Sequence, residues 1–406
     1  YKRQADEVDE MNQDNIALVS ERLAGQTSAS ENWLSTPTIP GYGIDALYKT
    51  TDQKHFFFPC PSCSRMIELD WPRNIVITAD SLTDPKINDC HYICHECKAV
   101  LPHEAKPEFL ADGEWVAEFP DRPDSGYWIP QLCSTAPAAD PIALVKKYLL
   151  GISNVAFQAD FYNSKLGKPH VVAGSQVQDI DIQMCTANYK LGDYKPGLIR
   201  TMGIDVGRII NYEICEWRVT GEINEADPTL NLIPRVIEVG ETTEFERLDL
   251  LIAQNKITKF VVDANPEYRE ATKLCHRFPG RGYISYYVHS IQARHMSVNL
   301  QERALSVNRT SWLDLSLGRF KTKTIQLPYD LPDAYKQHIK APIRQHKVRE
   351  RAVMGAKGGT GTGTGVTETT VIYTAIDPDH YAHARNYAEM AMAIHLLGGT
   401  TQDIRS

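Results

Sequence analysis

The sequence lacks any long hydrophobic run. No apolar stretch approaches the length of a membrane-spanning helix, and no signal peptide opens the chain. Positive charge is also not in excess, because 43 Lys and Arg stand against 51 Asp and Glu, for a formal net charge of −8. We therefore expect no membrane partner, and any nucleic-acid contact must come from a local basic patch.

Two further absences narrow the choice of function. Nine cysteines in 406 residues are too few for a secreted disulfide scaffold, so a reducing compartment with a metal site suits them better. The phosphate-binding pattern Gly-x-x-x-x-Gly-Lys-Ser/Thr does not occur, so this chain alone is not expected to hydrolyse ATP. The glycine-rich run 355–365 lacks that pattern too and predicts a flexible loop.

Four of the cysteines form the strongest local motif. Two Cys-x-x-Cys pairs about thirty residues apart predict a tetrahedral zinc site, with Cys60, Cys63, Cys94 and Cys97 as ligands. Four thiolates leave no open position, so the site is structural and its binding energy stabilises a small β-rich module. Cys90 and His91 lie just upstream and are rival ligands.

Paired acids near the start of the chain resemble a nucleotide-binding motif. Asp6 and Glu7 match the Walker B end of a strand, where Asp holds Mg²⁺ through water and Glu polarises the attacking water. The apolar strand that should precede them is absent, and an acidic helix start is the alternative. A helix is expected to run up to Leu23, and a strand over 33–38 ends in a polar turn.

The second half of the chain has an α/β pattern. Short helices are expected at 141–150 and 157–166, and the main boundary lies in the polar segment 171–197. Beyond it the strands are expected at 198–204, 212–218, 232–239, 260–262 and 283–288, with helices at 243–254, 268–275 and 380–397. Hairpins first and helices later resemble a ribonuclease H-like mixed sheet.

Acidic residues follow two of these strands. Asp205 lies where the first strand meets a turn, and Asp263 ends the strand 260–262. Ligands of open α/β sheets gather at the carboxyl ends of strands, so the two carboxylates are placed to share a site if their strands are neighbours. Ordinary turn residues are the alternative for both.

The last helix brings a third set of candidate ligands. Asp379 fits the N-cap position, and His380 and His383 share one face of the first helical turn. Simple capping with exposed histidines is the alternative. Oxygen ligands from separate elements, with histidine in support, favour Mg²⁺ or Mn²⁺, and two such ions cleave phosphodiesters.

A basic segment could supply the nucleic-acid contact. The region 319–351 has nine basic and three acidic side chains, a local charge of +6 in an acidic protein. Phosphate binding and an ordinary solvated surface are both consistent with it. The predicted DNA-binding residues are Lys321, Lys323, Lys336, Lys340, Arg344, Lys347, Arg349 and Arg351.

In combination these motifs resemble the large terminase subunit of tailed bacteriophages, of the lambda-like family. The resemblance spans nearly the whole chain and rests on the order of the motifs. They are Asp6-Glu7-Val8-Asp9, Ser35-Thr36-Pro37-Thr38 with Asp52-Gln53, the two cysteine pairs, Phe161-x-Asn163-x-x-Leu166-Gly167-x-Pro169, Gly203-Ile204-Asp205-Val206, Asn308-Arg309-Thr310 and His380-x-x-His383-Ala384-x-x-Tyr387.

The resemblance implies four segments. They are the C-terminal remnant of an ATPase domain (1–55), a zinc-ribbon module (56–115), a helical linker region (116–196) and a ribonuclease H-like nuclease domain (197–400). Asp205 and Asp263 match the family's first two metal ligands. Related terminases often carry His-x-x-Asp at the third, so here either Asp379 or His383 takes that role.

The implied function is cutting of concatemeric phage DNA by two-metal hydrolysis, in the cytoplasm of an infected bacterium. ATP is expected to bind only in a full-length protein. The implied partners are double-stranded DNA, the small terminase subunit and the portal or procapsid, with a homo-oligomer possible in the motor. The alternatives are a non-catalytic zinc-ribbon scaffold for packaging proteins and a transposase-like or resolvase-like nuclease.

Overall fold

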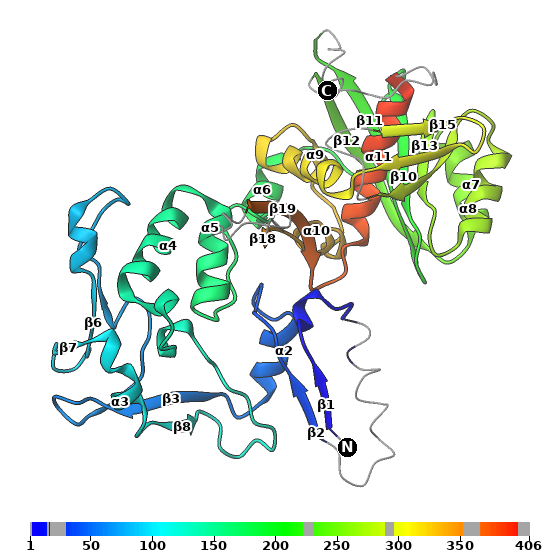
Figure 1. The fold of residues 1–406 in the computed structure, drawn as a ribbon. Coiled ribbons are helices and arrows are strands. Elements are labelled where there is room, and N and C mark those ends of the chain that lie inside the picture. The colour runs from blue at the N-terminus through cyan, green and yellow to red at the C-terminus, as the bar shows by residue number, and fades with distance from the viewer. Residues whose placement is uncertain are drawn as a thin grey trace, which may run out of the picture. The chain divides into compact units, whose positions relative to one another are not determined.

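The computed structural model describes residues 2–13, 16, 30–221, 231–288, 296–351 and 366–396. They belong to two compact units (Figure 1): unit 1 comprises Tyr1–Ala173 and Gln345–Ile372, and unit 2 comprises Gly174–Arg344 and Tyr373–Ser406. Unit 2 thus begins inside the predicted boundary segment 171–197, but before the start at 197 expected for the nuclease domain, because α6 (Asp179–Cys185) packs on its core. Most of the helix expected to end at Leu23, and all of the loop 355–365, lie outside the described residues.

Unit 1 starts with a parallel strand pair. Strand β1 (Lys2–Ala5) lies beside β2 (Ser30–Trp33), with Ala5 opposite Trp33. Strand β1 is mostly polar and was not predicted, and β2 begins and ends earlier than the strand predicted at 33–38. A short 3₁₀ turn, η1 (Val8–Glu10), follows β1, and α2 (Gly43–Thr50) comes after β2.

The rest of unit 1 combines short strands with helices around one core. Strands β3 (Lys54–Pro59), β4 (Met66–Ile67) and β8 (Glu114–Ala117) form one antiparallel sheet, and β5 (Ile75–Val76), β6 (His91–Ile93) and β7 (Val100–Leu101) form another. Helices α3 (Lys106–Leu110), α4 (Pro141–Ser153) and α5 (Val155–Asp160) complete it, and a π-helical turn at Phe161–Lys165 extends α5.

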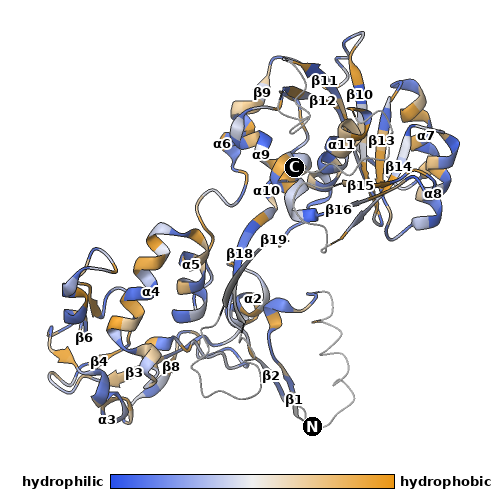
Figure 2. Cartoon of the chain, turned by 45° about the horizontal axis from the view of Figure 1, so that its top comes forward, coloured by the Kyte–Doolittle hydropathy of each residue, from blue (hydrophilic) through white to orange (hydrophobic). Residues whose placement is uncertain are grey.

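Helices α4 and α5 each begin after a residue whose side chain caps the helix. Asp140 accepts a hydrogen bond from the amide of Ile142 and Pro141 occupies the first turn of α4, while Asn154 caps α5 in the same way. Figure 2 shows hydrophobic residues along α4, and Leu144, Val145 and Leu149 pack on the strands of the cysteine-bearing sheets.

Unit 2 is built on a mixed sheet, as the sequence predicts, but with seven strands where five were predicted. The spatial order is β12-β11-β10-β13-β14-β16-β15; β10 to β12 are antiparallel, β10, β13, β14 and β16 run parallel, and β15 is antiparallel to β16. The strand bounds are β10 (Ile199–Asp205), β11 (Ile210–Val219), β12 (Leu232–Thr242), β13 (Lys259–Asp263), β14 (Gly282–Tyr287), β15 (Met296–Asn299) and β16 (Ala304–Val307).

Helices cover both faces of this sheet (Figure 1). Met202, Ile204 and Val262 point to one face and pack with α7 (Phe245–Gln254) and α8 (Tyr268–Arg277). Successive residues of a strand point to opposite faces. Thr201 and Val261 therefore lie on the other face, which α11 (His380–Leu396) covers.

Gly203 allows α11 to lie close against the sheet. A Cβ atom at this position would be 1.9 Å from the carbonyl oxygen of Ala384 and 2.3 Å from the amide nitrogen of Ala388. The backbone of the helix therefore occupies the space that any other side chain would need.

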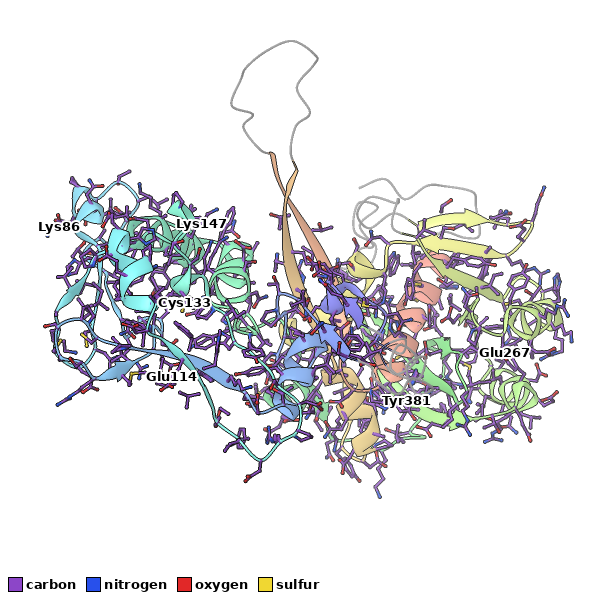
Figure 3. The ribbon with its side chains drawn as sticks, turned by 60° about the horizontal axis from the view of Figure 1, so that its bottom comes forward. Lys86, Glu114, Cys133, Lys147, Glu267 and Tyr381 are labelled. Carbon is purple, nitrogen blue, oxygen red and sulfur yellow. The ribbon has the colours of Figure 1, made fainter. Side chains whose placement is uncertain are left out.

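The remaining elements of unit 2 lie beside α11, where Figure 3 labels Tyr381. They are α9 (Arg309–Thr322), α10 (Asp333–Lys340) and the pair β9 (Thr186–Ala187) and β17 (Leu327–Pro328). Strands β18 (Pro342–Arg351) and β19 (Val366–Ala375) pair as a ribbon, most of which belongs to unit 1. A buried ion network joins α9 and α11 to β11, in which Arg319 binds Glu389 and Arg385 bridges Glu389 and Glu213. Each buried charge has a partner of opposite sign.

Candidate functional site

The carboxyl ends of two neighbouring parallel strands bring Asp205 and Asp263 to one edge of the sheet. Ile204 of β10 is paired with Val262 of β13, so the next residue of each strand is an aspartate on the face covered by α11. Asp205 is only 6% exposed. Two carboxylates at adjacent, largely buried positions repel each other unless a cation lies between them.

The first turn of α11 lies over these strand ends. His380 Nδ1 is 2.9 Å from a carboxylate oxygen of Asp205. This hydrogen bond raises the pKa of His380 against the opposing effect of burial, and the charge of Asp205 acts in the same direction. The helix can approach the strand this closely because Gly203 of β10, which has no side chain, faces Ala384, one helical turn after His380.

The carboxyl group of Asp263 has a raised pKa. Its pKa is raised to about 6, mainly by burial and also by the negative charge of Asp205, while a hydrogen bond from the amide of Asn265 opposes the rise. A bound cation would stabilise the ionised form of Asp263, because it would offset both the cost of burial and the repulsion by Asp205.

The protonation of Asp263 leads to a pH prediction. Its folded-state pKa lies above the unfolded value of about 3.9, so folding takes up a proton between about pH 4 and 6 and stability falls as pH rises through that window. Without divalent ions, Asp263→Asn is expected to be more stable than wild type by about 1–2 kcal/mol at pH 8, after solvent screening, and by about half of that at pH 5.

Urea unfolding of the magnesium-free protein at the two pH values measures this difference. Asp249→Asn, which removes an exposed partner of Arg277, is the matched control and should show no such pH dependence. A wild type more stable than Asp263→Asn at pH 8 would contradict the prediction.

A second cluster lies one turn along α11. His383 is buried, with Nδ1 3.0 Å from the hydroxyl of Tyr287 and Nε2 3.3 Å from a carboxylate oxygen of Asp379. Arg309 Nη2 approaches both, at 3.1 Å from His383 Nε2 and 3.5 Å from Asp379. Burial opposes ionisation of Asp379, but the hydrogen bond with His383 and the charges of His383 and Arg309 lower its pKa.

The predicted acidic ligands thus lie at one edge of the sheet, and two of them are each paired with a histidine of α11. Among the residues that the structure describes, only the four cysteines form a group of three or more metal donors within 4.8 Å of one another. Asp205 is paired with His380, and Asp379 with His383. The predicted roles of these residues as Mg²⁺ or Mn²⁺ ligands stay predictions.

Two neighbours of this site did not come from the acidic pattern. Tyr287 ends β14, and Arg309 follows β16, so both stand at the same carboxyl edge as Asp205 and Asp263. The strand-end rule would have indicated Tyr287, since its strand was predicted. Arg309 was noted only as part of a motif, because the four-residue β16 was not recognised as a strand.

The four predicted zinc ligands meet in unit 1. Cys60 Sγ lies 3.8 Å from Cys97 Sγ, and Cys63 Sγ lies 4.0 Å from Cys94 Sγ. A tetrahedral ion with bonds of about 2.3 Å to sulfur requires sulfur atoms about 3.8 Å apart, so this cluster could hold zinc. The rival Cys90 instead lies 3.2 Å from the hydroxyl of Thr78.

The two cysteine pairs have the same local geometry. The amide of Cys60 donates to Arg65 and that of Ser64 to Cys60; the amide of Cys94 donates to Ala99 and that of Lys98 to Cys94. Ser64 and Lys98 adopt positive φ of 59° and 63°, which turns the chain back after each pair. Two equivalent turns therefore present their thiols to a common centre.

At the start of unit 1, Asp6 and Glu7 directly follow β1, at the carboxyl end of the parallel pair. Asp6 accepts a hydrogen bond from the amide of Glu7. The buried acid of this segment is Asp9, which accepts from the amide and hydroxyl of Thr38, at 2.8 and 2.6 Å, and from the amide of Ile44. The nucleotide-related roles of Asp6 and Glu7 stay predictions.

Most of the predicted DNA-binding side chains have intramolecular partners. Within unit 2, Lys336 pairs with Asp333, Lys340 with Asp179 and Arg344 with Asp314, and in unit 1 Lys347 pairs with Glu10. Lys321 donates to the carbonyl of Gly174 and Lys323 to that of Lys321. The side chains of Arg349 and Arg351 are not described.

One residue counted in the basic segment is not at the surface. Arg319, which was counted in the local charge but not among the predicted DNA-binding residues, is 4% exposed and bound to Glu389. Sequence cannot separate it from its neighbours, because burial of an arginine depends on a partner 70 residues away.

None of the described helices is long and apolar enough to cross a membrane.

Residues 4–115 match the family model described as the ATPase domain of the phage terminase large subunit gpA. No curated protein matches the chain at a significant level.

Three solved structures of terminases are similar to the chain at low identity. The large terminase nuclease of thermophilic phage G20c is 12% identical, with a TM-score of 0.31, over 53% of this chain and 98% of that one. Two crystal forms of the large terminase of thermophilic bacteriophage D6E are 9% identical, also with TM-scores of 0.31, over 98% and 96% of this chain and 70% and 68% of those. The similarity to the phage terminase large subunits is therefore shown by a family model for residues 4–115 of this chain.

Proposed function

We propose that this chain cuts concatemeric phage DNA during genome packaging, as a metal-dependent endonuclease with its active site in a ribonuclease H-like unit 2. One observation carries the proposal: β10 and β13 end side by side in Asp205 and Asp263, beneath the first turn of α11. Oxygen donors in this arrangement suit Mg²⁺ or Mn²⁺.

The chemistry needs little more than a fixed cation and an oriented phosphate. A divalent ion held by Asp205 and Asp263 would lower the pKa of a bound water and offset charge on the phosphate. The water oxygen forms a bond to phosphorus while one ester P–O bond breaks. The leaving oxygen keeps the electron pair and gains a proton, and the water loses one.

The chain's own residues contribute position and charge. His380, hydrogen-bonded to Asp205, lies at the open side of the site, because its side chain is 45% exposed. It would hold Asp205 in place and could exchange a proton with water there. The second ion predicted at Asp379 or His383 stays a prediction, as do the DNA contacts of the basic segment.

The cysteine cluster and the acidic residues after β1 would serve genome packaging and not DNA cleavage. Cys60, Cys63, Cys94 and Cys97 would hold zinc as a structural ion. Asp6 and Glu7 would serve an ATPase domain in a full-length protein, for which the small terminase subunit and the portal or procapsid are the proposed partners.

Nicking of supercoiled plasmid in Mg²⁺ or Mn²⁺ tests the proposal. Asp205→Asn is expected to lower the nicking rate by at least about 100-fold, because a metal ion contributes several kcal/mol to such transition states. Asp249→Asn, an exposed acid on α7, is the matched control and should cut like wild type.

Each other result has a definite meaning. Equal nicking by wild type and Asp205→Asn would exclude this site. A zinc-loaded protein that never cuts DNA would favour the scaffold function. Strand-joined products would instead indicate a transposase-like enzyme.

A further inference from the structure

We propose that Arg309 takes the place of the second metal ion, so that the nuclease works with one divalent ion at Asp205 and Asp263 and a fixed guanidinium beside it. The inference rests on the proposed nuclease function and changes its metal stoichiometry. It concerns the pair Asp379 and His383, which the sequence predicts as ligands of a second ion.

The guanidinium of Arg309 is held at three points. Its Nη1 donates to the carbonyl oxygen of Tyr373 at 2.9 Å, and its Nη2 lies 3.1 Å from His383 Nε2 and 3.5 Å from Asp379. The backbone is fixed as well, because Arg309 is the first residue of α9 and Asn308 caps that helix through the amide of Ser311. A side chain held from two elements loses little further freedom when substrate binds.

The ring of His383 is also fixed, so Nε2 keeps facing Arg309. Its other nitrogen lies 3.0 Å from the hydroxyl of Tyr287, which accepts a hydrogen bond from the side-chain amide of Asn386. His383 is 9% exposed and packs near the ring of Tyr287. The two donor atoms that a second ion would need, Nε2 and a carboxylate oxygen of Asp379, therefore both face a cation of the protein itself.

Charge balance favours the same arrangement. The edge of the sheet carries three carboxylates, those of Asp205, Asp263 and Asp379. With His380 neutral, one divalent ion and one guanidinium balance their three negative charges, and arginine keeps its charge at every accessible pH. A second divalent ion next to Arg309 would add an unbalanced double charge a few ångströms away from another cation.

An arginine at this position suits phosphate chemistry. Guanidinium groups bind phosphate oxygens through paired hydrogen bonds, and fixed positive charge stabilises the charge that develops on a phosphoryl group in the transition state. Arg309 lies at the same strand edge as Asp205, with its side chain 31% exposed and so accessible to a DNA phosphate.

Manganese stoichiometry tests the inference without relying on activity. The zinc-loaded 406-residue chain, titrated with Mn²⁺ and followed by the electron paramagnetic resonance of free Mn²⁺, is expected to bind one ion. Asp379→Asn should also bind one, with an affinity within about threefold of wild type. Arg309→Gln should bind two, since it frees Asp379 and His383, and the double variant with Asp379→Asn should return to one.

Two controls keep the test decisive. Arg277→Gln removes another half-exposed Arg–Asp pair of unit 2 and should leave the count at one. Arg309→Lys keeps the positive charge and should also bind one ion. If Arg309→Gln does not fold, Arg309→Lys and wild type still test the predicted count. Two ions on wild type, falling to one in Asp379→Asn, would overturn the inference. Failure of the nuclease proposal looks different, because it would leave Mn²⁺ binding unchanged in Asp205→Asn.

Discussion

Removal of zinc, by a strong chelator or by Cys94→Ser, is expected to unfold the cysteine-bearing part of unit 1 while unit 2 stays folded. Strands β4, β5 and β7 are two residues long, too short to form a stable sheet by themselves. A Cys₄ zinc site supplies on the order of 10 kcal/mol to folding at neutral pH, so its loss exceeds the whole stability of many domains.

Zinc released to a metal-sensitive dye, together with limited proteolysis, measures this effect. Cys94 is fully buried among apolar side chains, so its replacement removes a ligand that no surface residue can supply. The matched control is Cys90→Ala, which removes a buried thiol of the same module that lies outside the cluster. It should keep one zinc ion and lose about 1–2 kcal/mol. Full zinc content in Cys94→Ser would contradict the prediction.

Gly203→Ala is expected to destabilise unit 2 by about 3 kcal/mol or more. The new methyl group would overlap the backbone of α11 at Ala384 and Ala388, which cannot move as a flexible side chain could. The helix must shift away from β10, and His380 must leave Asp205 with it. Urea unfolding measures the loss, and Mn²⁺ affinity at the site should fall in parallel.

Gly318→Ala is the matched control for this substitution. Gly318 lies in α9, and its Cβ atom would have no neighbour within 4 Å. Alanine is the better helix former by about 1 kcal/mol, so this variant should be as stable as wild type or slightly more stable. A Gly203→Ala protein within about 1 kcal/mol of wild type would show that α11 is not held against β10 as described.

The parts of the fold that the sequence predicted are those with local signals. Alternation and apolar runs placed β10 to β14 and helices α7, α8 and α11 within a few residues of their observed bounds. Elements without such a signal were missed, among them the polar β1 and the four-residue β15 and β16.

The sequence by itself determined which four cysteines cluster as candidate zinc ligands, because two Cys-x-x-Cys turns carry their geometry within a few residues. It also determined that Asp205 and Asp263 end strands. Only the tertiary structure decided that those strands are neighbours, that Gly203 lets α11 approach them, and that Arg309 faces Asp379 and His383. The physical reason is that these relations depend on strand order and on buried charge partners far apart along the chain, which leave no local pattern.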